Sequence, residues 1–179
     1  LDIDVSATVI GFLGRISVYK NTVSLIKNFF KLKDENLVLL LAGAPDGESI
    51  EEIKELARND SRIRLYLGLI QEDDIQLYLK AADLAVLPFL EILNSGTAML
   101  SLSFNCPILV PEKGSMGELK GYVGDEWVRT YSGDLTSEKI QDALDWCKRA
   151  RTADCPDLER FDWNKVAEQT KIGFERCLE

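Results

Sequence analysis

Two cationic side chains, Arg15 and Lys20, stand five positions apart, directly after an apolar run that ends at Gly14. That run, residues 8–14, is short and bounded by glycine, which is typical of a buried strand. In a loop between a central strand and a helix, Arg supplies a planar fork of donors and Lys a mobile point charge, a pair suited to a diphosphate. Two solvated surface cations are the alternative interpretation, because the segment is neither a Walker A loop nor a G-x-G-x-x-G turn.

A second candidate site is the segment Asn94-Ser95-Gly96-Thr97, which immediately precedes an expected helix. Free N–H groups, hydroxyls and the positive end of a helix dipole together make an anion-binding site. An ordinary helix N-cap is an equally open interpretation, because Asn and Ser are common caps.

Two further loops could contact a ligand. Leu69 and Ile70 follow Gly68, and this small apolar platform with free backbone groups could hold a flat base. A plain strand-to-helix turn is the alternative. Gly43 ends another apolar run and opens the segment 43–47, which could flank a ligand or form a flexible turn.

The elements expected to position these loops alternate along the chain. Buried strands are expected at residues 8–14, 37–42, 63–67, 84–87 and 107–110, with a shorter one at 127–131. Helices are expected at 21–32, 49–58, 72–82, 97–104, 137–149 and 164–177, with Asp162 as the N-cap of the last and Trp163 at its first position. Strands without alternation, separated by helices, predict an α/β fold: a doubly wound, mostly parallel, Rossmann-like sheet with helices on both faces. Ligands of such sheets bind outside the carboxyl ends of the strands, where the candidate residues are expected.

Composition narrows the classes of function. The 179 residues suffice for one α/β domain and are short for two. A net charge of −9 disfavours nucleic acid as a partner. The four cysteines form no C-x-x-C pair, which favours reduced, cytosolic thiols over a disulfide framework or a zinc site. No apolar run reaches the roughly 18 residues that span a bilayer. There is no histidine, so a base active at neutral pH must be a carboxylate or come from elsewhere.

The expected organisation is one Rossmann-like domain over residues 1–151 and a C-terminal helical tail over 152–179. The joint is placed at 152–157, which contains Pro156. The chain starts at Leu1 and reaches its first strand almost at once, so we expect it to be a piece of a longer protein. The tail is expected to pack on the same domain or to cross toward an N-terminal domain.

Six segments follow one another along the chain in a recognisable order: Gly14-Arg15-x4-Lys20-Asn21, Leu41-Ala-Gly43, Gly68-Leu-Ile, Ala82-Asp83-Leu-Ala-Val-Leu-Pro88, Pro107-Ile-Leu-Val-Pro111 and Phe161-Asp-Trp163. Together they resemble the motifs of one family, the C-terminal domain of group 1 glycosyltransferases with the two-domain GT-B fold. The resemblance implies transfer of a sugar from a nucleoside-diphosphate sugar to an acceptor hydroxyl. It places Arg15 and Lys20 on the diphosphate, where they stabilise the charge of the leaving group together with the helix N-terminus at 95–97.

The same resemblance implies donor contacts from Gly14, Gly43, Leu69, Ile70 and the turn at 94–97, and no metal ion or other cofactor. It also implies that acceptor contacts and the general base come from an N-terminal domain outside this sequence. This piece alone is then expected to be inactive, and a cytoplasmic enzyme is expected, with peripheral membrane contact through the N-terminal domain as an option.

The chain departs from the family pattern in one respect. The family places two glutamates eight positions apart between two prolines, and counting from Pro88 and Pro107 puts these positions at Ile92 and Leu100. Glu91, one residue away, could replace the first carboxylate. The turn at 94–97 resembles instead a subgroup with an S-G-[ST] turn, which includes mannosyltransferase-like enzymes of polysaccharide synthesis.

The missing carboxylates leave open a non-catalytic nucleotide-sugar-binding or scaffolding module. A third interpretation, a flavodoxin-like or dehydrogenase-like domain, requires a glycine-rich first turn. The segment Gly14-Arg-Ile-Ser-Val-Tyr is not such a turn.

Overall fold

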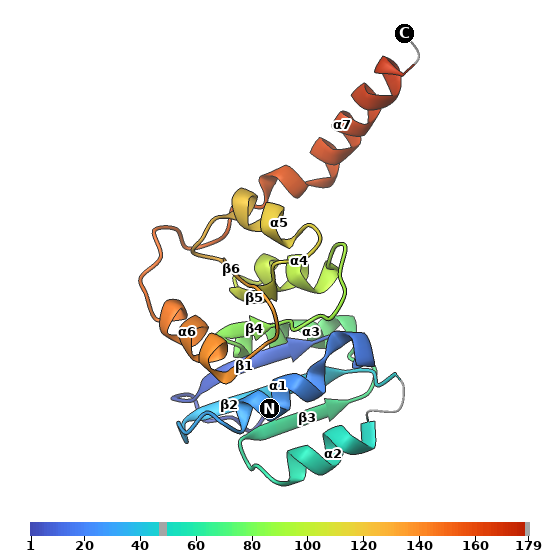
Figure 1. The fold of residues 1–179 in the computed structure, drawn as a ribbon. Helices are drawn as coiled ribbons and strands as arrows, with labels where there is room; N and C mark the ends of the chain where they lie inside the picture. Colours follow the sequence, from blue (N-terminus) through green and yellow to red (C-terminus); the bar gives the residue numbers. More distant parts are fainter. Residues whose placement is uncertain (47–49, 178–179) are drawn as a thin grey trace.

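The computed structural model describes residues 1–46 and 50–177, and its six described strands form one parallel sheet (Figure 1). The strand order is β3-β2-β1-β4-β5-β6. The strands are β1 (Thr8–Leu13), β2 (Leu37–Gly43), β3 (Ile63–Leu67), β4 (Leu84–Val86), β5 (Ile108–Pro111) and β6 (Val128–Tyr131). The order reverses between β1 and β4, as in doubly wound sheets, which confirms the predicted fold class.

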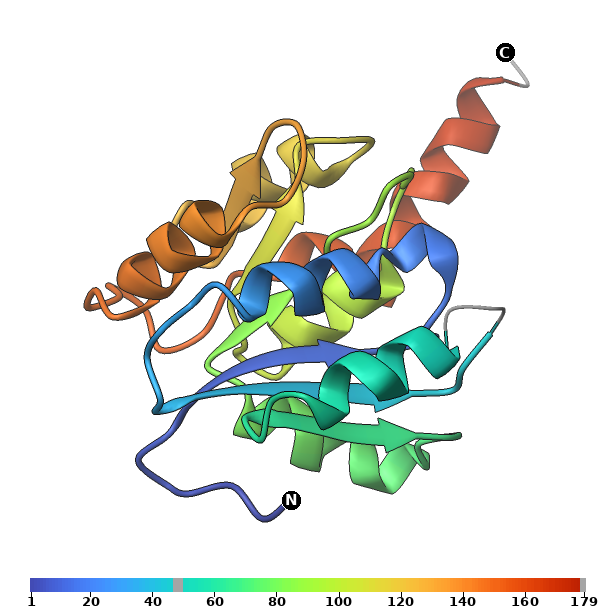
Figure 2. The same cartoon turned by 60° about the horizontal axis from the view of Figure 1, so that its bottom comes forward.

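Helices cover both faces of the sheet (Figures 1 and 2). The helices are α1 (Thr22–Phe29), α2 (Ile50–Arg58), α3 (Glu72–Ala81), α4 (Gly96–Ser103), α5 (Met116–Val123), α6 (Ser137–Cys147) and α7 (Trp163–Arg176), with 3-10 turns η1 (Val18–Lys20) and η2 (Glu159–Phe161). Helices α1, α2 and α6 lie on one face, and α3 and α4 lie on the other. The central strands are therefore buried on both sides, and all seven residues of β2 are buried, which explains their continuous apolar sequence.

Most predicted elements are confirmed to within one to three residues, but α5 was missed. Its sequence contains Gly117 and Gly121, and glycine disfavours a helix by about 1 kcal/mol relative to alanine. Packing overrides this propensity, because Met116, Leu119 and Val123 recur at helical spacing and are all buried. The predicted helix start at Ser49 lies outside the described residues.

The Ala82-Asp83 motif has a structural role at the amino end of β1. The Asp83 carboxylate accepts a hydrogen bond from the Val9 N–H at 2.7 Å. The backbone of β1 also passes close to the end of α3, because a Cβ on Gly11 would lie 2.6 Å from the Ala82 Cβ. Together these contacts align β1 with β4, so that both strands end at the same edge.

At the carboxyl edge, β1, β2 and β3 are each followed or ended by a glycine with positive φ: Gly14 at 134°, Gly43 at 149° and Gly68 at 151°. Backbone hydrogen bonds link them, from Gly14 N–H to the Ala42 carbonyl and from Gly68 N–H to the Gly43 carbonyl, both at 3.0 Å. A Cβ on Gly43 would lie 1.8 Å from the Gly14 carbonyl oxygen, so no side chain fits there. We call this edge, residues 14–20, 43–46 and 68–70 with the turn at 94–97, the rim.

The last helix extends away from the rest of the molecule (Figures 1 and 2). None of its described residues is buried, and the Trp163 side chain is 84% exposed. Asp162 is its N-cap, accepting from the Asn164 N–H at 2.9 Å, as predicted. Just before it, Phe161 packs edge-on against Tyr122 of α5. Whether α7 crosses toward another domain stays a prediction. In the described part of the chain, no helix combines the length and apolar character needed to cross a membrane.

The Asp83–Val9 hydrogen bond should contribute to stability. We expect Asp83→Ala to lower the free energy of unfolding by about 1 kcal/mol, because the Val9 N–H loses a charged acceptor. Urea denaturation measures this change, with Asp142→Ala on the exposed side of α6 as the matched control. Equal stability of the two variants would contradict this role.

The contact between Gly43 and Gly14 predicts unequal costs for two similar substitutions. Both Gly43→Ala and Gly68→Ala strain a positive φ, but a Cβ on Gly68 meets no atom within 4 Å. We expect Gly43→Ala to lower the free energy of unfolding by at least ~2 kcal/mol more than Gly68→Ala does, because only the former forces two backbones apart. Denaturant titration of both variants compares them, and equal costs would show that the close approach is unimportant.

Candidate functional site

Two backbone hydrogen bonds join the loop that contains Arg15, residues 15–20, to the loop after β2. The Ile16 N–H donates to the Ala44 carbonyl at 2.9 Å, and the Asp46 N–H donates to the Ile16 carbonyl at 2.7 Å. The Ile16 side chain is fully buried beneath them. This anchoring turns the neighbouring Arg15 side chain outward, where it is 66% exposed.

Arg15 has an acidic neighbour on the rim. Its Nη1 atom lies 3.1 Å from Oδ2 of Asp46, whose side chain is 56% exposed. An exposed pair of this kind contributes little to stability, so Arg15 can exchange Asp46 for an incoming anion at small cost.

The Lys20 side chain lies over the segment that follows β4. Its Nζ atom lies 4.0 Å from the centroid of the Phe89 ring, within cation–π range. Burial lowers the pKa of the Lys20 ammonium below its usual value. The neighbouring Tyr19 carbonyl accepts from the Leu90 N–H at 2.9 Å, which ties the loop to the same segment.

Asn21 ends this loop in the left-handed conformation, with φ 57°. It is also the N-cap residue of α1. Asn tolerates this conformation better than most residues, and glycine adopts it freely. The geometry therefore explains why the related motif carries Gly or Asn after its lysine.

The turn before α4 is both a helix cap and an exposed helix N-terminus. Ser95 is buried, and its Oγ accepts from the Ala98 N–H at 3.1 Å, so this hydroxyl is occupied as a cap. The first N–H groups of a helix have no partner within it, which leaves those of Gly96 and Thr97 available to an anion. The capping interpretation is thus confirmed, and it is compatible with anion binding.

Gly14, which directly precedes the Arg15–Lys20 loop, lies next to the start of α4. A Cβ placed on Gly14 would lie 3.2 Å from Oγ1 of Thr97, so the end of β1 touches the first turn of α4. The structure thus brings Gly14, Gly43 and Thr97 together at the centre of the rim, with Arg15 and Lys20 extending from the same loop.

Of the two residues predicted to contact a base, only Leu69 is exposed at the rim. Leu69 is 80% exposed beside this centre, whereas Ile70 packs against the buried cluster of Leu13, Ala42 and Leu79. Leu100, where the related pattern has a glutamate, packs on the same cluster. An apolar side chain suits that position, so the substitution is locally consistent with its surroundings.

A hollow of about 290 Å³ adjoins the α4 N-terminus. Asn94, Ser95 and Gly96 line it, together with Met116 of α5 and Phe161. Arg15 and Lys20 are not among its lining residues, so the two cations do not share this hollow with the turn. Among the described residues, no group of three or more His, Cys, Asp or Glu side chains is placed to hold a metal ion.

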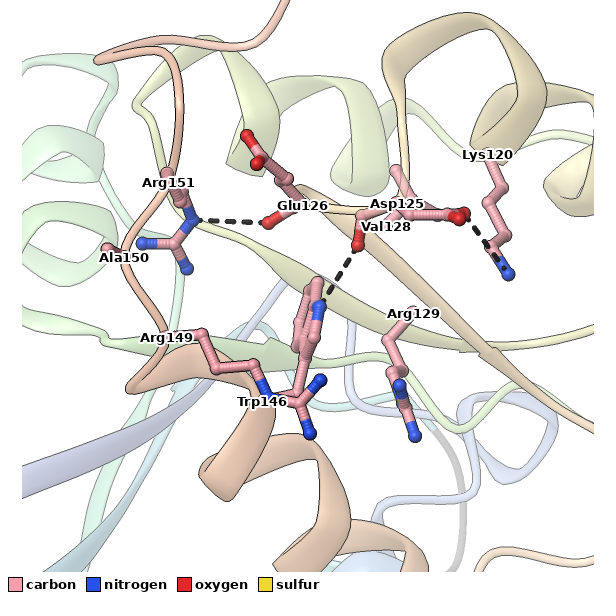
Figure 3. Close-up of a pocket in the computed structure, with 9 residues that line it drawn as sticks. All are labelled: Lys120, Asp125, Glu126, Val128, Arg129, Trp146, Arg149, Ala150 and Arg151. Atoms are coloured by element: carbon pink, nitrogen blue, oxygen red, sulfur yellow. Dashed lines mark hydrogen bonds and ion pairs between the residues drawn. The ribbon is translucent and has the colours of Figure 1, made fainter.

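Two features were not anticipated from the sequence. One is the structural role of Asp83. The other is a cation-lined hollow beside β6 that brings together Lys120, Arg129 and Arg149 (Figure 3). Its residues come from α5, β6, α6 and the segments that follow the two helices, and no short motif marks them.

Comparison with known proteins agrees with the fold and the motifs. The profile of the family described as "Glycosyl transferases group 1" matches residues 7–145. The GDP-mannose:glycolipid 4-beta-D-mannosyltransferase of Xanthomonas campestris pv. campestris is 30% identical over 156 residues, covering 87% of this chain and 45% of that protein. An uncharacterised glycosyltransferase of Methanocaldococcus jannaschii is 25% identical over 174 residues, again covering 45% of that protein. The chain therefore spans somewhat less than half the length of these relatives.

Solved structures share the fold. The C-terminal domain of a group 1 glycosyl transferase from Francisella tularensis superposes with a TM-score of 0.63 at 22% identity, over 77% of this chain and 73% of that one. The catalytic domain of starch synthase IV from Arabidopsis thaliana, bound to ADP and acarbose, gives a TM-score of 0.74 at 15% identity, over 98% of this chain and 39% of that one. Because the family profile matches most of this chain, residues 7–145, the chain belongs to the group 1 glycosyltransferases.

Proposed function

We propose that this chain is the donor-binding part of a glycosyltransferase and holds a nucleoside-diphosphate sugar at the rim. The observation that carries the proposal is the contact between Gly14 and Thr97, which sets the Arg15–Lys20 loop beside the N-terminus of α4. Two cations and free N–H groups at one edge suit the two phosphates of such a donor.

In the proposed reaction, a sugar moves from the nucleoside diphosphate to an acceptor hydroxyl. Negative charge grows on the departing diphosphate as the glycosidic bond breaks. Arg15 exchanges Asp46 for a phosphate oxygen, and Lys20, already partly desolvated against Phe89, interacts more strongly than a fully hydrated ammonium would. The α4 N–H groups are fixed in place, so they stabilise this charge without a reorganisation cost and without a metal ion.

The exposed Leu69 beside Gly68 is our candidate for the contact with the nucleobase. The name of the Xanthomonas relative specifies GDP-mannose as its donor. We therefore propose that the donor of this chain is a sugar linked to GDP, and we place GDP and GDP-mannose first among the ligands to be tested.

We propose further that an N-terminal domain supplies the acceptor site and the general base. The chain matches only 45% of its relatives' length and contains no histidine. An apolar stripe on α7, formed by Trp163, Val166 and Phe174, is exposed and available to such a domain. Catalysis would then require closure of the two domains around the donor.

A non-catalytic nucleotide-sugar-binding module is the second candidate. The specific observation in its favour is that Ile92 and Leu100 occupy the two carboxylate positions of the related pattern and pack on apolar clusters. Both candidates predict nucleotide binding at the rim. Incorporation of labelled sugar by the parent protein separates them, since only the enzyme transfers it.

The rim assignment predicts a loss of nucleotide affinity in two variants. We expect Arg15→Ala and Lys20→Ala each to weaken GDP binding about 10-fold or more, since each removes a charge-assisted contact to phosphate. Isothermal titration calorimetry with GDP, UDP and ADP measures this, with Lys80→Ala, an exposed cation at the end of α3, as the control. Unchanged affinity in both rim variants would rule out the phosphate assignment.

The Arg15–Asp46 pair predicts that loss of Asp46 strengthens GDP binding, whereas loss of Arg15 weakens it. Asp46→Ala removes the competitor for the Arg15 guanidinium and a negative charge beside the diphosphate. Because an exposed ion pair is worth up to about 1 kcal/mol, we expect GDP affinity to rise about 2- to 5-fold. The same calorimetric titration tests it, and the gain should be smaller in the Arg15→Ala background, where only the removal of the Asp46 charge remains. A loss of affinity would mean that Arg15 does not change partners.

A further inference from the structure

A hollow of about 330 Å³ lies at the amino end of β6, where α5 and α6 both end (Figure 3). The amino ends of parallel strands lie at the edge of the sheet opposite the rim, so this hollow is separate from the proposed donor site. Its size suits a small molecule or one head group rather than a folded partner.

Cations outnumber acids in its lining. Lys120, Arg129, Arg149 and Arg151 line it together with Asp125 and Glu126, in a chain whose net charge is −9. A local excess of cations on an acidic protein is a site at which anions concentrate.

Both acids are already engaged. The Lys120 Nζ lies 3.3 Å from Oδ1 of Asp125. Glu126 Oε2 accepts from the N–H and the hydroxyl of Thr152, each at 3.0 Å. Arg151 is engaged as well, because its Nε donates to the Glu126 carbonyl at 3.1 Å and its guanidinium stacks on the Trp127 ring.

Arg129 and Arg149 differ from these groups. Among residues 1–46 and 50–177, neither side chain has a hydrogen-bond or ion-pair partner. Figure 3 shows their guanidinium groups turned toward the same space, beside the Trp146 side chain. That ring is a fixed wall, since it is buried and its Nε1 donates to the Asp125 carbonyl at 3.0 Å.

A structural role accounts for only part of this arrangement. Cations near a helix C-terminus offset the helix dipole, which explains Lys120 at the end of α5 and Arg149 just after α6. Arg129 lies on β6 and offsets no helix end. Arg149 is exposed and Arg129 is half-buried, so water screens their like charges, and an anion bound between them would offset both.

We propose that Arg129 and Arg149 form a second phosphate-binding site, independent of the proposed donor site. Planar guanidinium groups bind phosphate oxygens through paired N–H donors, and two of them suit a phosphate monoester or a diphosphate. The phosphate belongs to a soluble metabolite or to a lipid head group, and the two sources share this chemistry.

Calorimetry with inorganic pyrophosphate tests the proposal in the 179-residue chain carrying Arg15→Ala and Lys20→Ala. These substitutions weaken the proposed rim site, so the part of the remaining binding that depends on Arg129 and Arg149 reports on the second site. We expect binding to persist there and to fall about 10-fold or more when Arg129→Ala and Arg149→Ala are added. Lys148→Ala, an exposed neighbour paired with Asp145, should leave it unchanged.

A second variant and a second ligand complete the test. Arg129→Lys with Arg149→Lys keeps the charge but removes the paired donors, so it should fold normally and bind pyrophosphate more weakly than the parent. Sedimentation with vesicles of phosphatidylcholine, with and without phosphatidic acid, whose head group is a phosphate monoester, distinguishes the sources, since only a lipid-binding site retains the chain on the anionic vesicles through Arg129 and Arg149.

Two results would overturn the proposal. One is that neither pyrophosphate nor anionic vesicles bind through Arg129 and Arg149. The other is that Arg149→Ala lowers the melting temperature while every anion affinity stays the same, which leaves only the helix-end role. If the rim assignment fails instead, pyrophosphate binding at Arg129 and Arg149 is unaffected, so the two failures are distinguishable.

Discussion

At the carboxyl edge of the sheet, the backbones after β1 and at the end of β2 approach each other so closely that no side chain fits between them. A Cβ on Gly43 would lie 1.8 Å from the Gly14 carbonyl oxygen. Only glycine accepts both this contact and a φ of 149°. Gly14 also lies next to Thr97, since a Cβ on Gly14 would be 3.2 Å from the Thr97 hydroxyl, so the first loop leaves the sheet beside the start of α4.

That backbone sets where the side chains of the rim begin, and contacts with Asp46 and Phe89 complete the placement of the two cations. Buried Ile16 holds the base of the loop, which leaves Arg15 exposed and paired with Asp46 across the surface. Lys20 rests on the Phe89 ring beside the segment that leads to α4. Fixed N–H groups and cations of this kind suit a diphosphate, because little reorganisation is needed when charge develops.

The sequence predicted the sheet well, since strands buried on both faces are continuously apolar and glycine marks their ends. It failed at α5, where Gly117 and Gly121 obscure a helix that packing stabilises. Motifs within single loops, such as Arg15 to Lys20, could be identified in advance, whereas their roles stay predictions. The hollow beside β6 could not be identified from the sequence, because Arg129 and Arg149 come together only through the tertiary fold.

The central claim, that the first loop and the start of α4 together hold a diphosphate, is tested most directly by a titration of the ¹⁵N-labelled chain with GDP, followed by NMR. The account predicts that the backbone amides of Gly14, Arg15, Gly96 and Thr97 shift together and yield one Kd. Shifts confined to other parts of the sheet, or different Kd values for the loop and for the α4 turn, would contradict it.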